Sequence, residues 1–450
     1  MTADKRTVYF GTAVHSTARS TMAVVPRVAI GVDAGTIAWM DTEAADGAAA
    51  AAAHDWAGAA VVTASPGEFF APGFLDTHIH ASQYPNVGLF GKTTLLDWLE
   101  TYTFPLESSF KDVAVAKNVY PRVIARTLSH GTTTASYYAT VHADATNVLA
   151  DLALAAGQRA FVGRCCMDAN SPAFYCDETV EAAQEATKAV VDHIAAIDPD
   201  HALVCPILTP RFAISCTREL MTWLGAFSRE HKLPVQTHVS ENKDEIAFTA
   251  KLHPYADSYT GVYDACGLLH DRTILAHAVH LSDDERALVA ARGAGVSHCP
   301  ISNSSITSGE ARVKWLLDGG VKVGLGTDVS GGYSPSILAV ARQALLVSRH
   351  LAMKGDDYHK LSLDEVFFLA TLGGAQVCGL EDKVGNFVPG KRWDAQLISL
   401  VRPGSPVDLF PGEAERLDDM VAKWFFNGDD RNVSKVWVDG RLVAGADSGL

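Results

Sequence analysis

Residues 72–84 read Pro-Gly-Phe-Leu-Asp-Thr-His-Ile-His-Ala-Ser-Gln-Tyr, an apolar run that ends in two histidines separated by one residue. In a β-strand, side chains at positions i and i+2 point to the same face, so His78 and His80 present two imidazoles together. Two imidazoles on one face are half of a metal site. A half-solvated strand explains the same spacing equally well, so the other ligands have to come from elsewhere in the chain.

The composition is that of a globular protein. The chain has 450 residues, of which 48% are hydrophobic and 20% are charged. This length allows several ordinary domains or one large α/β barrel with appendages. The net charge of -15 argues against nucleic acid and anionic membranes as partners. The eight cysteines form no C-x-x-C pair, and we interpret them as the reduced thiols of a cytoplasmic protein.

The middle of the chain, from about residue 73 to residue 380, alternates apolar runs with amphipathic stretches. This pattern predicts repeated βα units and a parallel sheet. Helices are predicted at residues 178–197, 218–231 and 282–292, and Ser282 with Glu285 forms a capping box at the start of the last one. Eight candidate strands, the number that a closed barrel needs, cover residues 74–77, 133–136, 159–165, 203–207, 235–237, 273–276, 295–297 and 321–324.

Both ends of the chain show short β segments broken by glycine and polar turns. They include residues 8–10, 28–30 and 61–62 near the start, and residues 395–400 and 433–438 near the end, before the turn signal Asp439-Gly440. We therefore predict an α/β protein with a (β/α)8 barrel of the TIM type. The catalytic barrel takes residues 72–384, and residues 1–71 and 385–450 combine in one small β-sandwich domain.

Five polar residues stand at the ends of four predicted strands. His78 and His80 end the first strand, His238 the fifth and His277 the sixth, and Asp328 follows the eighth. In a barrel these residues converge, because barrel enzymes carry their chemistry at the C-terminal ends of the strands. Imidazoles with a carboxylate suit a borderline metal such as zinc, with one position left for water. Each residue alone is more often an ordinary strand-end residue, but their joint placement favours a metal site.

Several motifs resemble the amidohydrolase superfamily and, within it, the guanine deaminase branch. The H-x-H and G-T-D pieces at residues 78–80 and 326–328 are shared widely in the superfamily. The stretches HASQYPNVG, TYTFPLE and TPRF, at residues 80–88, 101–107 and 209–212, are typical of that branch. The likeness covers nearly the whole predicted barrel.

The resemblance implies a zinc-dependent guanine deaminase that hydrolyses guanine to xanthine and ammonia, works in the cytoplasm and forms a homodimer. It implies one zinc ion per subunit, held by the side chains of His78, His80, His238 and Asp328. His277 is expected beside the water that the metal activates. A second metal is not expected, because residues 203–212 contain no lysine to bridge it.

Hydrolytic deamination at C2 of guanine needs a nucleophile, a base and an acid. Zinc lowers the pKa of its water from about 15.7 to about 7, and Asp328 is placed to take the proton. Glu241 comes three residues after His238, in the first turn after a strand. It can deliver a proton to the ring, as a glutamate that is not a ligand does in zinc deaminases generally. The alternative for Glu241 is an acid that interacts with a helix dipole.

Substrate recognition has three further candidates, Gln83, Arg211 and Phe212. Guanine carries a carbonyl acceptor at position 6, where adenine carries an amino donor. Arginine has only donors, so Arg211 at that edge favours guanine over adenine. Phe212 can stack on the purine, and Gln83 can meet another ring edge. A loop salt bridge for Arg211 and core packing for Phe212 are the alternatives. The other predicted substrate contacts are His80, His238, Glu241 and Asp328.

Two other functions stay open. Another deaminase of the superfamily, acting on a related purine, a pterin or a triazine ring, would share the metal but differ at Gln83, Arg211 and Phe212. A non-enzymatic scaffold would have lost the ligands that this chain keeps. A cytidine-deaminase-like zinc fold would need H-x-E followed by P-C-x-x-C, and the sequence has neither. His280 and His298 are not counted as ligands.

Overall fold

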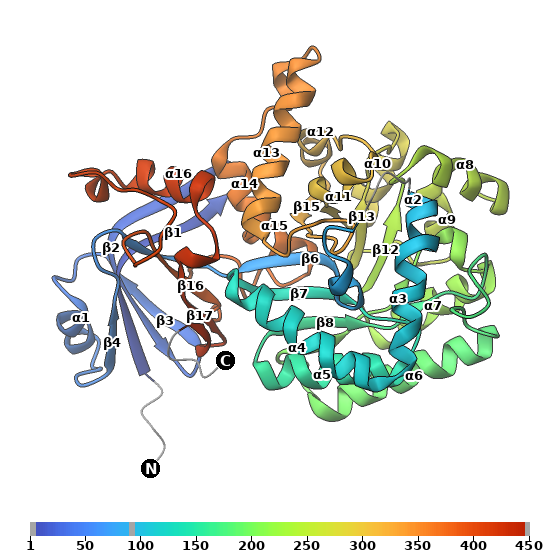
Figure 1. Cartoon of the computed structure of the whole chain (residues 1–450). Helices are drawn as coiled ribbons and strands as arrows, with labels where there is room; N and C mark the ends of the chain where they lie inside the picture. Colours follow the sequence, from blue (N-terminus) through green and yellow to red (C-terminus); the bar gives the residue numbers. More distant parts are fainter. Residues whose placement is uncertain (1–5, 90–94, 446–450) are drawn as a thin grey trace.

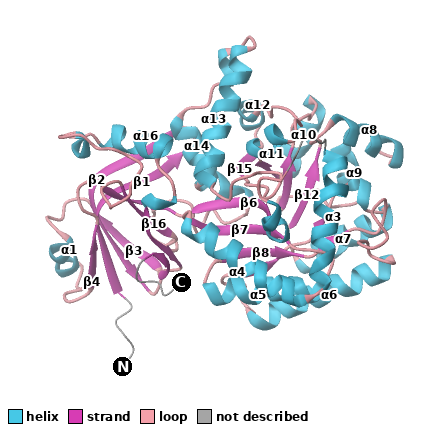
Figure 2. Ribbon diagram, in the orientation of Figure 1, coloured by secondary structure: helices cyan, strands magenta, loops and turns pink. Residues whose placement is uncertain are grey.

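The computed structural model describes residues 6–89 and 95–445. Figure 1 shows two parts side by side: the two ends of the chain, in blue and red, form a β-rich part, and the middle surrounds its strands with helices. Figure 2 shows the same division, with helices on the outside of the larger part. The chain is an α/β protein, as the sequence predicts.

Eight strands of the middle part run parallel in two four-stranded sheets. The first sheet has the order β10-β8-β7-β6 and the second the order β12-β13-β14-β15. All eight strands overlap the predicted ones, because strands buried on both faces read as short apolar runs. Their bounds are β6 (Phe74–His80), β7 (Thr132–Tyr138), β8 (Arg159–Gly163), β10 (Val204–Pro206), β12 (Val235–Val239), β13 (Thr273–His277), β14 (Gly295–His298) and β15 (Lys322–Leu325).

The two sheets join on both sides, and we call the result the strand ring. On one side, Leu208 forms a parallel bridge with Val235 of β12. On the other side, the backbone N–H of Asp328, after β15, donates to the carbonyl of His78 in β6 at 2.8 Å. Because the strands are parallel, all of their C-terminal ends lie at one end of the ring.

All eight strands differ from their predicted limits by one to three residues, and three of these differences lie close to the ends that matter for the site. β6 continues to His80, so both histidines of the opening motif lie within the strand and are buried. The predicted strand 159–165 divides at Arg164, whose Nε donates to a loop carbonyl at 2.8 Å. The fourth strand covers Val204–Pro206, one residue shorter at each end than predicted. Beyond these breaks, β9 (Cys165–Cys166) pairs with β11 (Thr209–Pro210).

Helices pack around the strand ring. The predicted helix 218–231 is α7, with the same limits. The other two predicted helices begin one or two residues late, because Thr179 and Ser282 are their N-caps, and the expected capping box is present. The bounds are α2 (Leu95–Trp98), α3 (Phe104–Ser108), α4 (Val113–Ser129), α5 (Ala143–Ala156), α6 (Val180–Ile197), α7 (Arg218–His231), α8 (Lys243–Leu252), α9 (Tyr259–Ala265), α10 (Asp283–Arg292), α11 (Pro300–Ser305), α12 (Val313–Asp318), α13 (Ile337–Met353), α14 (Leu363–Ala370) and α15 (Leu372–Val377).

Strands from both ends of the chain form one terminal sheet in the order β18-β17-β16-β5-β1-β2-β3, with β4 paired to β1. β5 and β16 join the two ends through an antiparallel ladder in which Pro72 lies opposite Ala395. The elements of this part are β1 (Arg6–Ala18), β2 (Thr21–Asp33), β3 (Thr36–Asp41), α1 (Gly47–Ala53), β4 (Ala60–Thr63), β5 (Glu68–Pro72), β16 (Ala395–Ser399), α16 (Leu417–Asn427), β17 (Val433–Val438) and β18 (Arg441–Gly445).

The terminal sheet folds over an aromatic core. The ring of Tyr9 in β1 stacks on Trp393 at 4.3 Å between centroids and meets the edge of Trp437 in β17 at 5.3 Å. Strands from the two ends of the chain therefore share one core. The predicted turn at Asp439 and Gly440 joins β17 to β18, and both residues have positive φ angles, 54° and 76°.

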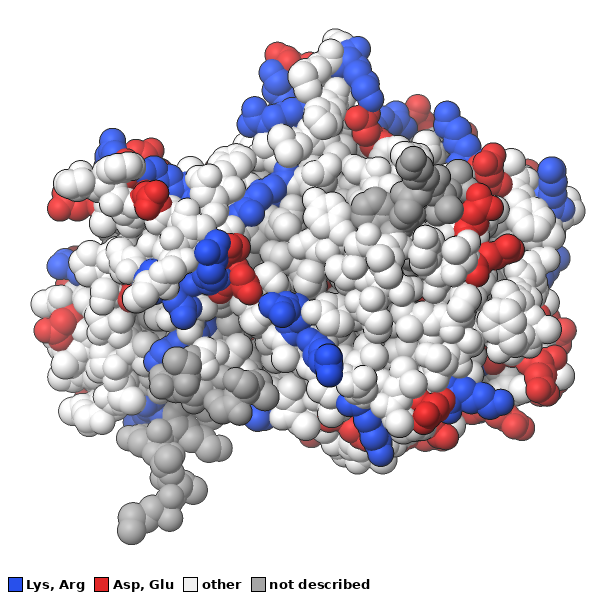
Figure 3. Space-filling view, viewed as in Figure 1, with Lys and Arg blue, Asp and Glu red and all other residues white. Residues whose placement is uncertain are grey.

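Figure 3 shows one face of the molecule, on which uncharged atoms cover most of the area. Lys and Arg stand in separate groups, and acidic side chains gather along the right edge. This face does not carry the continuous basic surface that nucleic-acid binding needs. Within residues 6–89 and 95–445, every helix falls short of the length and apolar character that crossing a membrane requires.

A buried ion pair connects the terminal segment to the strand ring. Nε and Nη2 of Arg159, at the start of β8, donate to the carboxylate of Asp394 at 3.0 and 3.2 Å. Nη1 of Arg159 donates to the carbonyl of Ala202 at 2.7 Å. Asp394 also accepts the backbone N–H of Asp439 at 2.8 Å. Removing either partner therefore leaves the other charge uncompensated away from water.

We expect Arg159→Ala to destabilise the fold by about 3–5 kcal/mol, because truncating one partner of a buried ion pair strands the other charge. Arg6→Ala is the control. It breaks an exposed pair with Asp33 at 3.2 Å and should cost less than about 1 kcal/mol. Denaturant unfolding of both variants beside the unaltered protein measures the difference. Equal midpoints for the two variants would show that the buried pair contributes no more than a surface pair.

Candidate metal centre and active site

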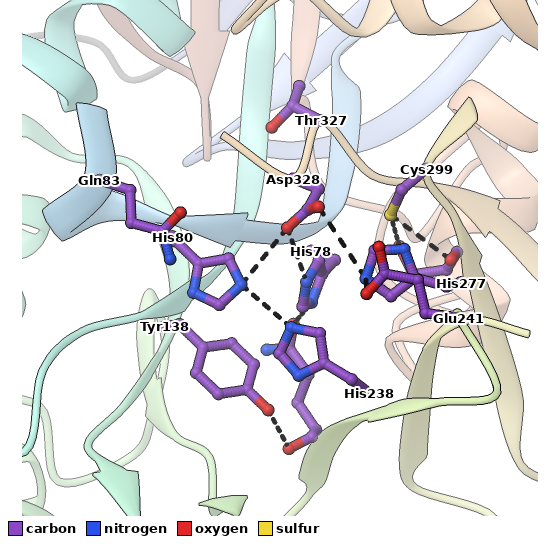
Figure 4. A network of polar contacts seen from close by, with 12 residues as sticks. His78, His80, Gln83, Tyr138, His238, Glu241, His277, Cys299, Thr327 and Asp328 are labelled. Carbon is purple, nitrogen blue, oxygen red and sulfur yellow. Dashed lines mark hydrogen bonds and ion pairs between the residues drawn. The ribbon is translucent and has the colours of Figure 1, made fainter. Parts of the chain in front are cut away.

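Four side chains meet inside the strand ring at the C-terminal ends of its strands. His78 and His80 come from β6, His238 comes from β12, and Asp328 follows β15. Their ligand atoms all lie within 4.8 Å of one another. Nε2 of His78 and Nε2 of His80 are 3.2 and 3.3 Å from Oδ1 of Asp328. Nε2 of His80 is 3.1 Å from Nε2 of His238. The structure thus brings together the four residues predicted as metal ligands (Figure 4).

The outward nitrogens of two histidines are held by protein acceptors. Nδ1 of His78 lies 2.5 Å from Oε1 of Gln236. Nδ1 of His238 lies 2.5 Å from the backbone carbonyl oxygen of Arg211. An acceptor at Nδ1 places the proton there and leaves the lone pair of Nε2 for a metal. Within the described residues, Nε2 of His78 is buried and has no hydrogen-bond partner, which fits a position facing a cation.

The protonation states also fit a metal. Burial lowers the pKa of His80 to about 4 and moves the pKa of His238 well below its ordinary value. Burial works to raise the pKa of Asp328, but contacts with His78 and His80 hold that pKa well below its ordinary range. Neutral imidazoles and an ionised carboxylate are the forms that bind a divalent metal.

We call His78, His80, His238 and Asp328 together the metal cluster, meaning the side chains that could hold one metal ion. His277 and Glu241 lie beside it. Nε2 of His277, at the end of β13, is 3.9 Å from Oδ2 of Asp328 and 3.4 Å from Oε2 of Glu241. Nδ1 of His277 lies 2.9 Å from Oδ1 of Asn303, which holds the ring in place. The Ser308 hydroxyl donates to Oε1 of Glu241 at 3.1 Å. Figure 4 shows both His277 and Glu241 on the Asp328 side of the cluster.

Glu241 has an acidity suited to proton transfer. Burial, helped by the nearby charge of Asp328, raises the pKa of Glu241 to about 8. A carboxyl group with this pKa holds a proton at neutral pH and can give it up there. The acidity of Glu241 is thus compatible with the role of an acid, which stays a prediction of the sequence.

The backbone is strained at three strand ends of this site. Ser240, His277 and Asp328 have φ angles of 48°, 74° and 46°. Such left-handed conformations are uncommon outside glycine and cost on the order of 1–3 kcal/mol each. They persist only where the surrounding structure determines them, and they gather at functional sites. This local strain supports the assignment of the cluster as an active site.

A pocket lies against the metal cluster and contains every side chain predicted to contact the substrate. It is lined by His80, His238, Glu241 and Asp328, together with Gln83, Arg211 and Phe212. The remaining lining residues are His277, Glu245 and the apolar side chains Leu95, Trp98, Leu99 and Ile306.

Arg211 both lines the pocket and forms a buried ion pair. Its Nη1 is 2.6 Å from Oε2 of Glu107, and its Nη2 is 3.4 Å from Oε1 of the same carboxylate. Its guanidinium carbon stands 5.1 Å from the ring centroid of Phe104. The sequence left a salt bridge and a pocket role as alternatives, and the structure combines them. Phe212 likewise packs in an apolar cluster and lines the pocket.

The sequence did not single out Glu107, Gln236, Asn303 or Ser308. Glu107 ends the stretch TYTFPLE, which carries the family resemblance and could have drawn attention to it. Asn303 and Ser308 lie in the stretch SHCPISNSSITSG, which also resembles the family, whereas Gln236 acts through a tertiary contact outside those motifs. His280, expected to have no metal role, places Nε2 2.8 Å from the carbonyl of Ser308 and is not part of the cluster.

A ring of βα units that gathers imidazoles, a carboxylate and a nearby glutamate at one end has the arrangement of a metal-dependent hydrolase. Comparison with known proteins is specific: the amidohydrolase family model matches residues 69–443. The chain belongs to the amidohydrolase family, and it is a hydrolase of carbon–nitrogen bonds.

Proteins similar to it include guanine deaminases. The probable guanine deaminase of Schizosaccharomyces pombe is 50% identical over 382 residues, which are 84% of this chain and 72% of that protein. The guanine deaminase of Mus musculus is 42% identical over 441 residues, 97% and 96% of the two chains. The crystal structure of guanine deaminase from C. acetobutylicum, with guanine bound in its active site, has a TM-score of 0.89 at 33% identity and covers 98% of this chain and 100% of that one.

We expect His238→Ala to abolish metal binding, because the cluster then lacks one neutral imidazole ligand. Elemental analysis after dialysis should find about one metal ion per chain in the unaltered protein and little in the variant. His280→Ala is the matched control, since it removes a histidine outside the cluster and should keep the metal. Full metal content in His238→Ala would contradict the ligand assignment.

Proposed function

We propose that this protein is a zinc-dependent guanine deaminase that hydrolyses guanine to xanthine and ammonia. The observation that carries this proposal is that the buried guanidinium of Arg211 lines the same pocket as the metal cluster and Glu241. One pocket thus offers the means both to recognise a carbonyl-bearing ring and to hydrolyse it. The relatives support the substrate, since they are guanine deaminases and one of them binds guanine in its active site.

We assign one zinc ion per subunit to the metal cluster of His78, His80, His238 and Asp328. Three imidazoles and one carboxylate are ligands that zinc commonly takes, with room left for water. When bound, the metal would lower the pKa of a water molecule, so that hydroxide is available as the nucleophile near neutral pH.

Two carboxyl groups, those of Asp328 and Glu241, carry out the proton transfers. Asp328 starts as a carboxylate and can accept a proton from the attacking water. Glu241 starts protonated and can donate to a ring nitrogen, which prepares C2 for attack by water; the proton that Asp328 accepted can then pass to the amino group, which leaves as ammonia. His277 lies within 3.4 Å of Glu241 and 3.9 Å of Asp328, so it can orient both groups.

Three other residues of the pocket, Arg211, Phe212 and Gln83, recognise the purine ring. Arg211 can donate to the carbonyl oxygen at position 6 of guanine, where adenine would present a donor. Phe212 can stack on the ring, and Gln83 can meet another edge. The apolar side chains of Leu95 and Trp98 help to exclude water, which strengthens the polar contacts inside.

The wider organisation follows the same family. We assign residues 72–384 to a catalytic (β/α)8 barrel built on the strand ring, and residues 1–71 and 385–450 to a small β-sandwich domain built on the terminal sheet. The eight cysteines are free, which fits the reducing cytoplasm. A homodimer is the family expectation, and light scattering of the purified protein tests it.

The substrate can be tested on the purified, metal-loaded protein. Guanine should release ammonia and yield xanthine, whereas adenine, cytosine and a triazine should react far more slowly, because none of them carries a carbonyl in the place of O6 on the fused purine ring, where Arg211 can donate to it. Ammonia release together with product identification measures this. A pterin or triazine that reacts better than guanine would favour the other deaminase of the superfamily.

Glu241→Gln should keep the metal but lower kcat on guanine by roughly 10²–10⁴, the usual contribution of a general acid or base. Glu285→Gln is the control, since Glu285 is a buried helix-capping carboxylate that does not line the pocket. Steady-state kinetics at matched metal content compares the two. A Glu241→Gln variant within a few fold of the unaltered protein would remove Glu241 from the proton transfers.

A further inference from the structure

We infer that Glu107 is a positioning residue for substrate selection, which fixes Gln83 and Arg211 as hydrogen-bond donors so that the pocket selects a ring edge carrying acceptors. The inference rests on the proposed function and deepens it. Glu107 itself does not line the pocket, whereas both of its partners do. It therefore acts on the substrate through them.

Glu107 is fully buried on the short helix α3 and contacts both recognition residues. Its Oε1 accepts Nε2 of Gln83 at 2.8 Å, and its two oxygens accept Nη1 and Nη2 of Arg211 at 2.6 and 3.4 Å. Phe104, three residues earlier on the same helix face, covers the guanidinium. One helical turn thus holds Arg211 from two sides.

The charge state of Glu107 determines what its neighbours can do. Burial raises the pKa of Glu107, but the charge of Arg211 outweighs this and brings the pKa below its ordinary value. Glu107 is therefore a carboxylate, which can only accept hydrogen bonds. Gln83 must present its NH₂ group to this carboxylate and cannot present its oxygen there.

The other end of the Gln83 amide is held as well. Its Oε1 accepts the backbone N–H of Ser330 at 3.1 Å and the Ser330 hydroxyl at 3.4 Å. Ser330 follows the predicted metal ligand Asp328 by two residues, and Gln83 follows His80 by three. Glu107, Gln83 and Ser330 thus form a buried chain of hydrogen bonds that connects Arg211 to the segments following His80 and Asp328.

Gln83 and Arg211 thus form a part of the pocket lining that offers hydrogen-bond donors to a ligand, and we call it the donor wall. The NH₂ group of Gln83 has a second N–H, and Arg211 has five donors and no acceptor. Guanine carries acceptors at O6 and N7, whereas a purine with an amino group at C6 directs a donor at this wall. A buried donor left without an acceptor lowers binding by about ten- to a hundredfold. Without the carboxylate of Glu107, the guanidinium of Arg211 loses the partner that fixes it and the Gln83 amide keeps only its contacts with Ser330, so the discrimination weakens.

Glu107→Gln tests this with two substrates. 2,6-Diaminopurine keeps the reactive amino group at C2 and carries an amino group where guanine has its carbonyl. In the variant, kcat/KM for guanine should fall about ten- to a hundredfold while that for 2,6-diaminopurine falls only a few fold, so the preference narrows. Equal proportional losses on both substrates, at matched metal content, would overturn the inference.

Two further variants separate positioning from general damage. Glu365→Gln removes a buried carboxylate that also pairs with an arginine, Arg19 at 3.1 Å, but lies outside the pocket, and it should leave the preference unchanged. Glu107→Asp keeps an acceptor-only group and should retain the preference even where the rate falls. A preference lost to the same extent in Glu107→Asp and Glu107→Gln would overturn the donor-fixing role.

Binding to the unaltered protein tests the donor wall without any variant. Hypoxanthine has the C6 carbonyl and adenine the C6 amino group, and neither carries the amino group at C2. Calorimetry should find hypoxanthine bound about tenfold or more tightly than adenine. Equal affinities would overturn the inference. If guanine is not deaminated but hypoxanthine is still preferred, the proposed function fails while the donor wall stands.

Discussion

The architecture depends on the seam between β15 and β6, where Asp328 serves two purposes. Its backbone N–H donates to the carbonyl of His78, and its carboxylate faces Nε2 of His78 and of His80. The preceding Thr327 reinforces the seam, because its N–H and hydroxyl donate to the buried carboxyl of Asp76 at 3.0 and 2.5 Å. The same two residues thus close the strand ring and complete the metal cluster, so closure of the ring and the geometry of the site are coupled.

Much of the ring and the whole cluster could be predicted because both follow from local rules. Apolar runs of strand length locate the strands, and parallel strands bring the residues at their C-terminal ends together. Glu107 obeys no such rule. It lies on a short helix between β6 and α4, and its partner Arg211 is 104 positions away. A buried ion pair of this kind exists only once the fold has brought its members together.

The terminal sheet shows a second limit of sequence patterns. Its first strands look short in the sequence because glycine and polar residues interrupt them, yet β1 and β2 each extend over 13 residues. The ladder between them tolerates a register shift between Gly11 and Ala13, so the interruption bends the strand without ending it. The sequence also does not reveal the partners of each strand: β1 pairs with β2 along nearly its whole length, and also with β4 near its start and with β5 at Ala13.

Because β5 pairs with β16, β5 has to wait for its partner strand while the chain is being synthesised. Pro72 lies opposite Ala395, which leaves the ribosome roughly 320 positions later. At about 5–20 residues per second, this interval is roughly 15–65 s. During that time β5 presents an open edge, to which a strand of another chain can add. Loss of the residues that form β16 would leave that edge of β5 open permanently.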